Sequence, residues 1–308
     1  LDYYIFPCAE GDKSTYYESV NQCLDLYYSQ KSSVKQIDDI KKTITGAVKT
    51  HIKKTEKKIA AQKEKLLECK SGENYRIFGE LITANIYKIK GGAAVTVENY
   101  YDNNKPVLIK LDEKLSPSQN AQMYFKKYNK LKNAKIQVEK QLEIAEEYLS
   151  YLNSLIDYTK SAQTLAELEE IKEEIISQNI LSRAKNDTQK KAKAIEINKT
   201  EADGFTIYWG KNNIQNDYIT FKIAKPYDLW FHIKSAHGRH VILSTQGKEP
   251  TDKAINAAAE IAANGSRAEI DYTYKKYVKK PSGAKPGFVI YSNYKTLFIK
   301  QSNQDNLT

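Results

Sequence analysis

Residues 116–158 read SPSQNAQMYFKKYNKLKNAKIQVEKQLEIAEEYLSYLNSLIDY, and this stretch decides the fold of the helical part of the chain. It opens with an N-cap serine, a proline at the first helical position and a glutamine at the third, which together predict a helix start. A helix of this length reaches roughly 60 Å at ~1.5 Å per residue and cannot bury an apolar seam alone. Its heptad-like seam consists of Leu131, Val138, Leu142, Ala145, Leu149, Leu152 and Ile156.

The expected partner of this helix is a lysine-rich helical segment between about residue 33 and Gly72. Its apolar positions recur at spacings of three, four or seven, which indicates one buried stripe. We therefore predict a long antiparallel helical coiled-coil arm over residues 31–182. Residues 1–30 are assigned to the end of an upstream region, with a separate helix over 14–30. The stripe consists of Ile44, Val48, Ile52, Thr55, Ile59 and Leu66.

A small α/β tip, residues 72–115, is predicted between the two arm helices. Residues 75–90 favour a short helix closed by glycines. Residues 95–101 and 106–111 alternate as two strands around Asp102–Asn104, which is typical of a hairpin.

A third helix over 165–178 carries five glutamates, which we assign to a solvated face. Residues 183–202 are polar and lysine-rich, and we interpret them as a linker. A compact α+β domain is predicted over 203–302, which is long enough to build its own core. Its expected strands are 205–209, 228–233, 240–244, 272–278, 288–291 and 296–300, and its expected helices are 217–224, capped by Asn216, and 252–263, capped by Thr251.

The composition describes a basic, globular chain of 308 residues with a formal net charge of +10. Such an excess favours acidic partners, above all nucleic acid, although a lysine-rich surface kept for solubility explains it equally well. Cys8, Cys23 and Cys69 show no paired spacing, which argues against disulfides or zinc and for a cytoplasmic protein. No apolar run is long enough to cross a membrane. The first residue is Leu1 rather than Met, and we expect a piece of a longer protein.

The first candidate site is the strand Asp228–Ile233. Alternate side chains of a strand share a face, so Asp228, Trp230 and His232 lie together, opposite the expected core residues. An outward carboxylate, indole and imidazole suit stacking and hydrogen bonding to a ligand. The alternative is a second buried layer in which the tryptophan packs and Asp228 pairs with His232. A metal site that adds His237 and His240 is a weaker alternative, because no tight ligand spacing recurs.

The second candidate site is a lysine-rich segment between residues 272 and 291. Clustered lysines neutralise phosphates, and interleaved tyrosines offer stacking faces. The alternative is a solvated edge strand whose lysines prevent aggregation. The lysines are Lys275, Lys276, Lys279, Lys280 and Lys285.

The third candidate site is the polar loop Gly210–Asp217, which leads into a predicted helix. Lys211, with Asn212, Asn213 and free backbone amides, can hold a phosphate. An ordinary turn with an asparagine cap fits the local chemistry slightly better. The loop is not a P-loop, and neither a G-x-G-x-x-G motif nor a nucleophile motif is present. We therefore assign no catalytic residue, no metal and no cofactor.

The C-terminal segments resemble the NFACT-R domain of the NFACT family, and the middle of the chain resembles that family's coiled-coil arm. The resemblance runs from about Ser14 to Lys300. The matching C-terminal segments are Gly204-Phe205, Gly210–Asn213, Gln215–Tyr218, Asp228-x-Trp230-x-His232, His240–Ile242, Asp271–Thr273 and Lys279–Gly287. Those of the arm are Gly79–Asn85, Asn99–Tyr101 and Leu115–Ala134.

This resemblance implies a function. The bacterial RqcH-like members of the family bind large ribosomal subunits that carry a stalled peptidyl-tRNA, and they recruit alanyl-tRNA for template-independent alanine tailing. The ribosome makes the bond, so we expect a binding protein rather than an enzyme. Its partners would be the large subunit, rRNA and tRNA. By resemblance, Asp228, Trp230, His232 and His240 would belong to an RNA-facing surface.

Two departures from the family pattern matter. We expect the N-terminal domain and most or all of the helix-hairpin-helix region to lie outside this sequence, and Gly265–Asp271 to be shorter than the family pattern. Family members long labelled fibronectin-binding suggest an alternative, an extracellular adhesin with fibronectin as its partner. A metal-dependent nucleic-acid enzyme using Asp228 and His232 is a further alternative.

Overall fold

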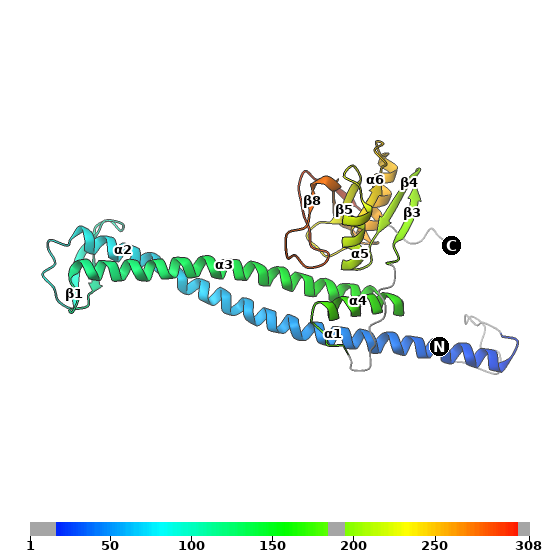
Figure 1. Cartoon of the computed structure of the whole chain (residues 1–308), viewed down its shortest axis with the longest axis horizontal. Helices are drawn as coiled ribbons and strands as arrows, with labels where there is room; N and C mark the ends of the chain where they lie inside the picture. Colours follow the sequence, from blue (N-terminus) through cyan, green and yellow to red (C-terminus); the bar gives the residue numbers. More distant parts are fainter. Residues whose placement is uncertain (1–16, 184–194, 301–308) are drawn as a thin grey trace. The chain divides into compact units, whose positions relative to one another are not determined.

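The computed structural model describes residues 17–183 and 195–300. These residues form two compact units. One unit takes its described residues from 1–52 and 150–308, and the other comprises 53–149. The α plus α+β class predicted from the sequence is confirmed, with long helices followed by an antiparallel-sheet domain (Figure 1).

The long helices are α1 (Val20–Lys70) and α3 (Pro117–Ser161). The predicted start of α3 is confirmed, because Gln119 N–H donates to Ser116 Oγ and Ser116 N–H donates to Gln119 Oε1. The predicted break between residues 30 and 33 is wrong. Neither glycine nor proline occurs there, and serine lowers helix propensity too little to end a helix.

The unit formed by residues 53–149 contains the predicted tip. Helix α2 (Gly72–Ala84) packs on an antiparallel hairpin of β1 (Ala94–Asn99) and β2 (Lys105–Lys110). The turn is confirmed, since two of its residues, Asn103 and Asn104, adopt left-handed backbone angles. Lys63 pairs with Glu146 across the helices in this unit, at 3.0 Å. The tip core contains Leu81, Ile82, Ile89, Val97, Ile109, Ala121 and Tyr124.

The α+β domain is built on a six-stranded antiparallel sheet in the order β10-β7-β5-β6-β4-β3. Helix α6 covers one face of it with a row of alanines. A second apolar layer covers the other face of the central strands. The strands are β3 (Asn198–Ala202), β4 (Phe205–Trp209), β5 (Leu229–Ile233), β6 (Val241–Ser244), β7 (Ala268–Tyr274) and β10 (Lys295–Ile299), and α6 is Asp252–Ala263.

Several local predictions in this domain are corrected. Strand β3 begins inside the predicted linker, and β7 starts and ends about four residues early. The chain then turns through a short 3-10 helix, η2 (Lys275–Tyr277), into β8 (Val278–Lys279), which pairs with β9 (Ile290–Tyr291).

The predicted helix over 217–224 is also wrong in its start and its cap. Helix α5 (Asn213–Tyr218) begins four residues earlier and continues as a π-helical turn, η1 (Ile219–Ile223). Asn212 is the cap, because its side chain accepts from Gln215 N–H at 2.8 Å. The side chain of Asn216 instead ties α5 to β6 by accepting from His240 N–H.

Candidate nucleic-acid interface

Strand β5 is buried on both faces, and this overturns the expected outward stacking surface. Leu229 and Phe231 face the layer of α6, as predicted. Trp230 is 0% exposed and packs in the opposite layer with Ile219, Ile242 and Val278. The indole therefore acts as core, as in the second-layer alternative. It stacks at 5.6 Å on His232, with ring planes 13° apart.

The carboxylate of Asp228 is buried and braces the backbone. Its Oδ2 accepts from Lys225 N–H at 2.7 Å and its Oδ1 from Thr245 N–H at 2.9 Å. The expected pairing with His232 is therefore absent from its described contacts. Asp228 thus stabilises the turn at 225–228. The chain after β7 packs against this turn, where Lys275 N–H donates to Asp228 O at 2.8 Å.

The two histidines near Trp230 are held neutral by their surroundings. Burial lowers the pKa of His232 to about 4, and it lowers the pKa of His240 well below its ordinary value. The rings lie 5.3 Å apart, edge to face, and His240 Nδ1 lies 2.9 Å from Thr220 Oγ1. Neither ring brings a positive charge to a phosphate at neutral pH.

A basic surface lies beside this buried layer. Lys276 is exposed, with its Nζ 5.0 Å from the ring centre of Tyr277, and Lys275 Nζ lies 5.5 Å from that of Phe221. Lys279 is exposed and has no recorded partner among the described residues. We call this surface the basic ridge. It comprises Phe221, Lys222, Lys225, Tyr227, Tyr274, Lys275, Lys276, Tyr277 and Lys279.

Four ridge residues were missed by the sequence analysis. Phe221 and Lys222 lie in η1, and Lys225 and Tyr227 lie in the turn that Asp228 braces. The signal was available, because lysine and aromatic residues alternate here as they do after residue 272. The fold brings these four residues close to the predicted lysines. One of the hydrogen bonds that hold the two segments together runs from Lys276 N–H to Pro226 O.

Two of the predicted lysines are left out of the ridge because their side chains bond within the protein. Lys280 forms an ion pair with Asp217, whose pKa is raised by burial despite this lysine. Lys285 Nζ donates to Gln178 Oε1 at 2.9 Å. A phosphate would have to replace these partners.

Within the predicted Gly210–Asp217 loop, the segment Gly210–Gln215 comprises a short loop and the first residues of α5. We call this segment the Gly210–Gln215 loop. Helix α4 (Leu165–Ser177) covers it. Four side-chain donors of this segment bond to carboxylates of α4. The prediction that all five glutamates of α4 face solvent is therefore wrong, because Glu167, Glu170 and Glu174 face the protein. Asn212 and Asn213 are almost fully buried. The contacts are Lys211 Nζ to Glu167 (2.8 Å), Asn212 Nδ2 to Glu170 (2.6 Å), Gln215 Nε2 to Glu170 (2.7 Å) and Asn213 Nδ2 to Glu174 (3.1 Å).

Glu174 lies deepest in this row, at 1% exposed. Burial raises the pKa of its carboxyl to about 7, although bonds from Tyr151 and Asn213 oppose the shift. Its second oxygen, Oε2, has no partner among the described residues. The contact between α4 and the loop therefore contains a group that titrates near neutral pH.

Comparison with known proteins identifies the family. A family description reading "NFACT N-terminal and middle domains" matches residues 1–194, and one reading "NFACT protein RNA binding domain" matches residues 195–283. The chain belongs to the NFACT family. The second match contains the whole basic ridge and the whole Gly210–Gln215 segment.

Similar NFACT proteins include two named "Rqc2 homolog RqcH". The one from Bacillus subtilis is 36% identical over 92% of this chain and 51% of its own length. The one from Streptococcus suis is 36% identical over 94% of this chain and 53% of its own length. The chain thus spans about half the length of these curated relatives.

A solved structure shares the NFACT architecture. It is the C-terminal part of a fibronectin/fibrinogen-binding protein from Streptococcus suis, with a TM-score of 0.69 and 32% identity, covering 86% of this chain and 96% of the other. Neither family description names a reaction. Within residues 17–183 and 195–300, no cluster of three or more candidate metal ligands occurs, and no helix is long and apolar enough to cross a membrane.

Proposed function

We propose that this NFACT chain is the RNA-binding part of a cytoplasmic ribosome quality control factor. It binds the large ribosomal subunit and tRNA, with alanyl-tRNA as the tRNA that serves template-independent alanine tailing of stalled nascent chains. The single observation that carries the proposal is the basic ridge, where exposed and partly exposed lysines alternate with exposed and partly exposed aromatic rings in the family's RNA-binding domain. Single-stranded or looped RNA is bound by cations, which contact its phosphates, and by aromatic rings, which stack on its bases. The ridge offers both.

The predicted site residues take two roles in this proposal. Lys275, Lys276 and Lys279 contact phosphates directly, because their amino groups pair with no carboxylate in the described part of the chain. Asp228, Trp230, His232 and His240 act as positioning residues. Trp230 lies in the buried layer with both histidine rings against it, and Asp228 braces the turn that belongs to the ridge. The loop donors Lys211, Asn212 and Asn213, together with Lys280 and Lys285, reach RNA only if their present partners move away.

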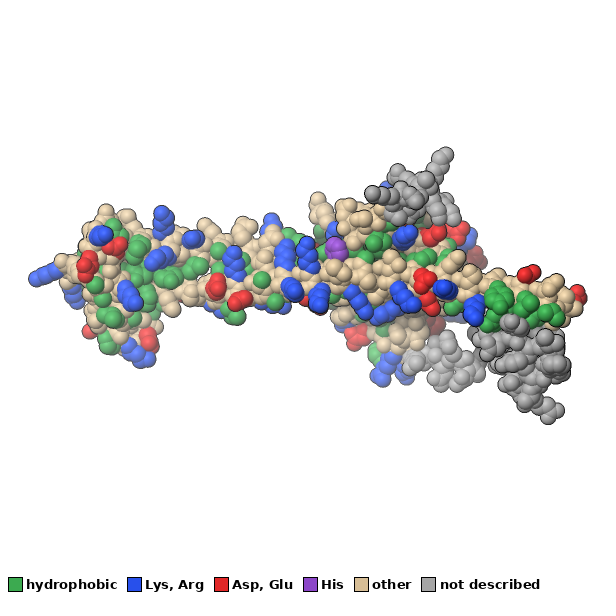
Figure 2. Space-filling model, turned by 90° about the horizontal axis from the view of Figure 1, so that it is seen from below, with side chains coloured by type: hydrophobic (Ala, Val, Ile, Leu, Met, Phe, Trp, Pro, Cys, Tyr) green, Lys and Arg blue, Asp and Glu red, His purple; other side chains and the backbone are tan. Residues whose placement is uncertain are grey.

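A second basic surface supports an acidic partner for the helical part. Figure 2 shows Lys and Arg side chains gathered along the face on which α1 lies. A polyanion as large as rRNA suits such an extended arrangement better than a small ligand. The exposed lysines of α1 include Lys42 and Lys49 in one compact unit and Lys53, Lys54, Lys57 and Lys58 in the other.

The test is a salt titration of binding to purified large subunits and to tRNA. We expect Lys276→Ala/Lys279→Ala to weaken binding and to make the log–log salt slope shallower by roughly 0.7–0.9 for each lost phosphate contact. The control is Lys248→Ala/Lys253→Ala, which removes the same charge from exposed positions of the same domain. Equal losses in both double variants would show that net charge alone matters and would refute the ridge.

The similar structure of a fibronectin/fibrinogen-binding protein favours one alternative, a surface adhesin that binds fibronectin. Protease treatment of intact cells separates the two functions, because an adhesin is cleaved from outside and a cytoplasmic factor is protected. The enzyme alternative predicts RNA turnover that depends on a divalent metal. Our proposal predicts none with Mg²⁺ or Mn²⁺ added.

A further inference from the structure

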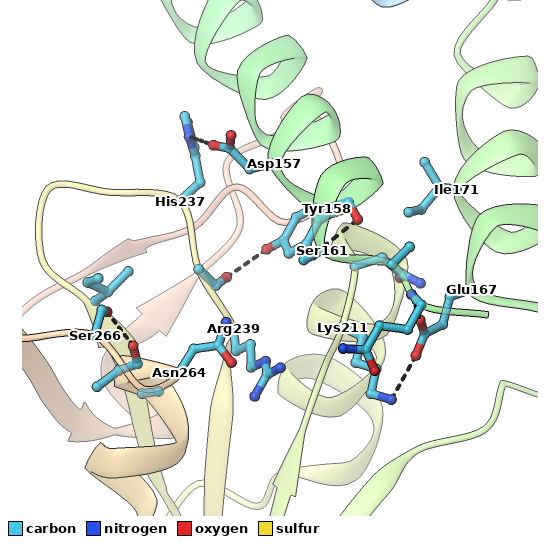
Figure 3. A pocket seen from close by; sticks show the side chains of 17 residues that line it. Asp157, Tyr158, Ser161, Glu167, Ile171, Lys211, His237, Arg239, Asn264 and Ser266 are labelled. Carbon is cyan, nitrogen blue, oxygen red and sulfur yellow. Dashed lines mark hydrogen bonds and ion pairs between the residues drawn. The ribbon is translucent and has the colours of Figure 1, made fainter. Parts of the chain in front are cut away.

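A pocket of about 270 Å³ lies where the end of α3, the start of α4 and the α+β domain meet. All of these segments belong to one compact unit. Figure 3 shows Arg239 inside this pocket, with Lys211 and Glu167 on one wall and Asn264 on another. The side chain is half-buried, so its guanidinium has lost part of its hydration.

The other ionisable groups of the pocket each have a partner in it. Lys211 Nζ lies 2.8 Å from Glu167 Oε1, and His237 Nδ1 lies 3.5 Å from Asp157 Oδ2. In the described part of the chain, no carboxylate lies within ion-pair distance of Arg239 and no acceptor is hydrogen-bonded to it. Arg239 is therefore the one lining charge among these five groups that lacks a partner.

This arrangement costs folding free energy. Burial lowers the pKa of the Arg239 guanidinium, and the negative charge of Glu167 only partly opposes the shift. An arginine that served the fold would be expected to bond a carboxylate or a carbonyl, because an unpaired buried charge destabilises the folded state. Its five donors in a rigid fork fit a tetrahedral oxyanion.

Two further donors line the same pocket without a recorded partner. The side-chain amides of Gln163, before α4, and Asn264, after α6, make no recorded hydrogen bond among the described residues. An oxyanion bound at Arg239 has these neutral donors within the same pocket to complete its coordination. The volume is close to the lower limit of small-ligand sites, which suits a phosphate with its sugar rather than a larger cofactor.

We propose that this pocket binds a phosphate group of RNA, with Arg239 as its anchor. The inference rests on the proposed RNA binding and adds a subsite that is separate from the basic ridge. A terminal phosphate and an internal backbone phosphate share the required chemistry, and the experiment distinguishes them. A peptide carboxylate is the competing class, which the same experiment tests.

The first measurement is thermal unfolding of Arg239→Met in phosphate-free buffer. Removing an unpaired half-buried charge leaves the melting temperature unchanged or raises it, whereas removing a structural arginine lowers it. Arg267→Met is the matched control, because Arg267 is an exposed arginine of the same domain that stacks on Phe298 at 5.0 Å. A clear fall in melting temperature for Arg239→Met alone would overturn the proposal.

The second measurement is binding of RNA oligonucleotides with a 5′-phosphate or a 5′-hydroxyl, beside inorganic phosphate and a glutamate-rich peptide. We expect Arg239→Met to weaken RNA binding roughly tenfold or more, the loss for a charged hydrogen bond, and to make the salt slope shallower by about one. A loss confined to the 5′-phosphate RNA indicates a terminal phosphate, and a loss for both RNAs indicates an internal one.

Three outcomes of the binding measurement would overturn the subsite. They are equal RNA affinity of Arg239→Met and the wild-type chain, an equal loss in Arg267→Met, and peptide binding that depends on Arg239 while RNA binding does not. Failure of the proposed function looks different, because the wild-type chain itself would then bind no RNA and Lys276→Ala/Lys279→Ala would change nothing.

Discussion

The basic ridge and the Gly210–Gln215 loop belong to one domain and have similar local chemistry, yet the fold treats them in opposite ways. Both segments present lysines and polar groups that the sequence analysis named as candidates for phosphate binding. The ridge leaves Lys276 and Lys279 exposed, whereas the loop meets the carboxylates of α4. The comparison teaches that residue type sets what a segment can bind, and that the neighbouring element decides whether the segment is free to bind it.

The energetics of the two surfaces differ accordingly. On the ridge, a phosphate replaces water around the lysines and releases counterions. At the loop, it must first displace charge-assisted hydrogen bonds such as Asn212 to Glu170, which are about twice as strong as neutral ones. Without a rearrangement of α4, we therefore expect RNA at the ridge and not at the loop.

The largest expected effect is a loss of folding stability when the buried layer beneath the ridge is disrupted. Trp230→Ala removes a side chain that is 0% exposed, and it should lower the free energy of unfolding by about 3–5 kcal/mol. Urea unfolding followed by circular dichroism measures the change. Tyr227→Ala, at a ridge position that is 47% exposed, should cost less than about 0.5 kcal/mol.

A second substitution at this position separates packing from stacking on RNA. Trp230→Phe keeps an aromatic ring in the buried layer and removes an indole N–H that has no described partner. It leaves a smaller cavity than Trp230→Ala, so it should cost clearly less. A cost below 1 kcal/mol for Trp230→Ala, with RNA binding lost, would mean that the indole is a contact residue and not core.

The next effect is the pH dependence of folding stability that Glu174 produces at the contact between α4 and the Gly210–Gln215 loop. The pKa of Glu174 is raised from an ordinary 4.5 to about 7 in the folded state, so the folded chain binds more protons than the unfolded chain between these values. Its contribution to stability is present below about pH 4.5 and is lost as pH rises to about 7. The loss is on the order of 3 kcal/mol, at about 1.36 kcal/mol per pKa unit.

Glu174→Gln should abolish this dependence and should be the more stable protein at pH 8. Urea unfolding at pH 5, 6, 7 and 8 measures it, with Glu143→Gln on the exposed surface of α3 as the control. Parallel pH profiles for the wild-type chain and Glu174→Gln would show that the carboxyl does not titrate in this window.

The smallest effect compares the loop with the ridge directly. Lys211→Ala removes a partly exposed pair with Glu167, so it should cost less than about 1 kcal/mol of stability. It should leave the salt slope of RNA binding unchanged, unlike Lys276→Ala/Lys279→Ala. A slope as shallow as that of the ridge variant would place the loop on the RNA and require α4 to move.

Much of the fold was predictable from the sequence because its signals are local. The capping pair Ser116–Gln119, the hairpin turn at Asp102–Asn104 and the cap Thr251 act between residues close in the chain, and each is found as predicted. The start of α5 was missed because Asn212 and Asn216 are equally good caps by residue type. Asn216 is not the cap because its side chain accepts a hydrogen bond from the backbone N–H of His240, which is distant in the chain.

The sequence by itself determined the helical arm, the antiparallel α+β class and the family, because periodicity, caps and motif spacing are properties of neighbouring residues. Only the tertiary structure decided which polar groups face solvent. A second apolar layer buries Trp230, helix α4 covers Asn212 and Asn213, and no carboxylate of residues 17–183 or 195–300 pairs with Arg239. The physical reason is that the exposure and ion pairing of a side chain depend on segments that are far apart in the chain. The alternation of residues along a single strand contains no information about those segments.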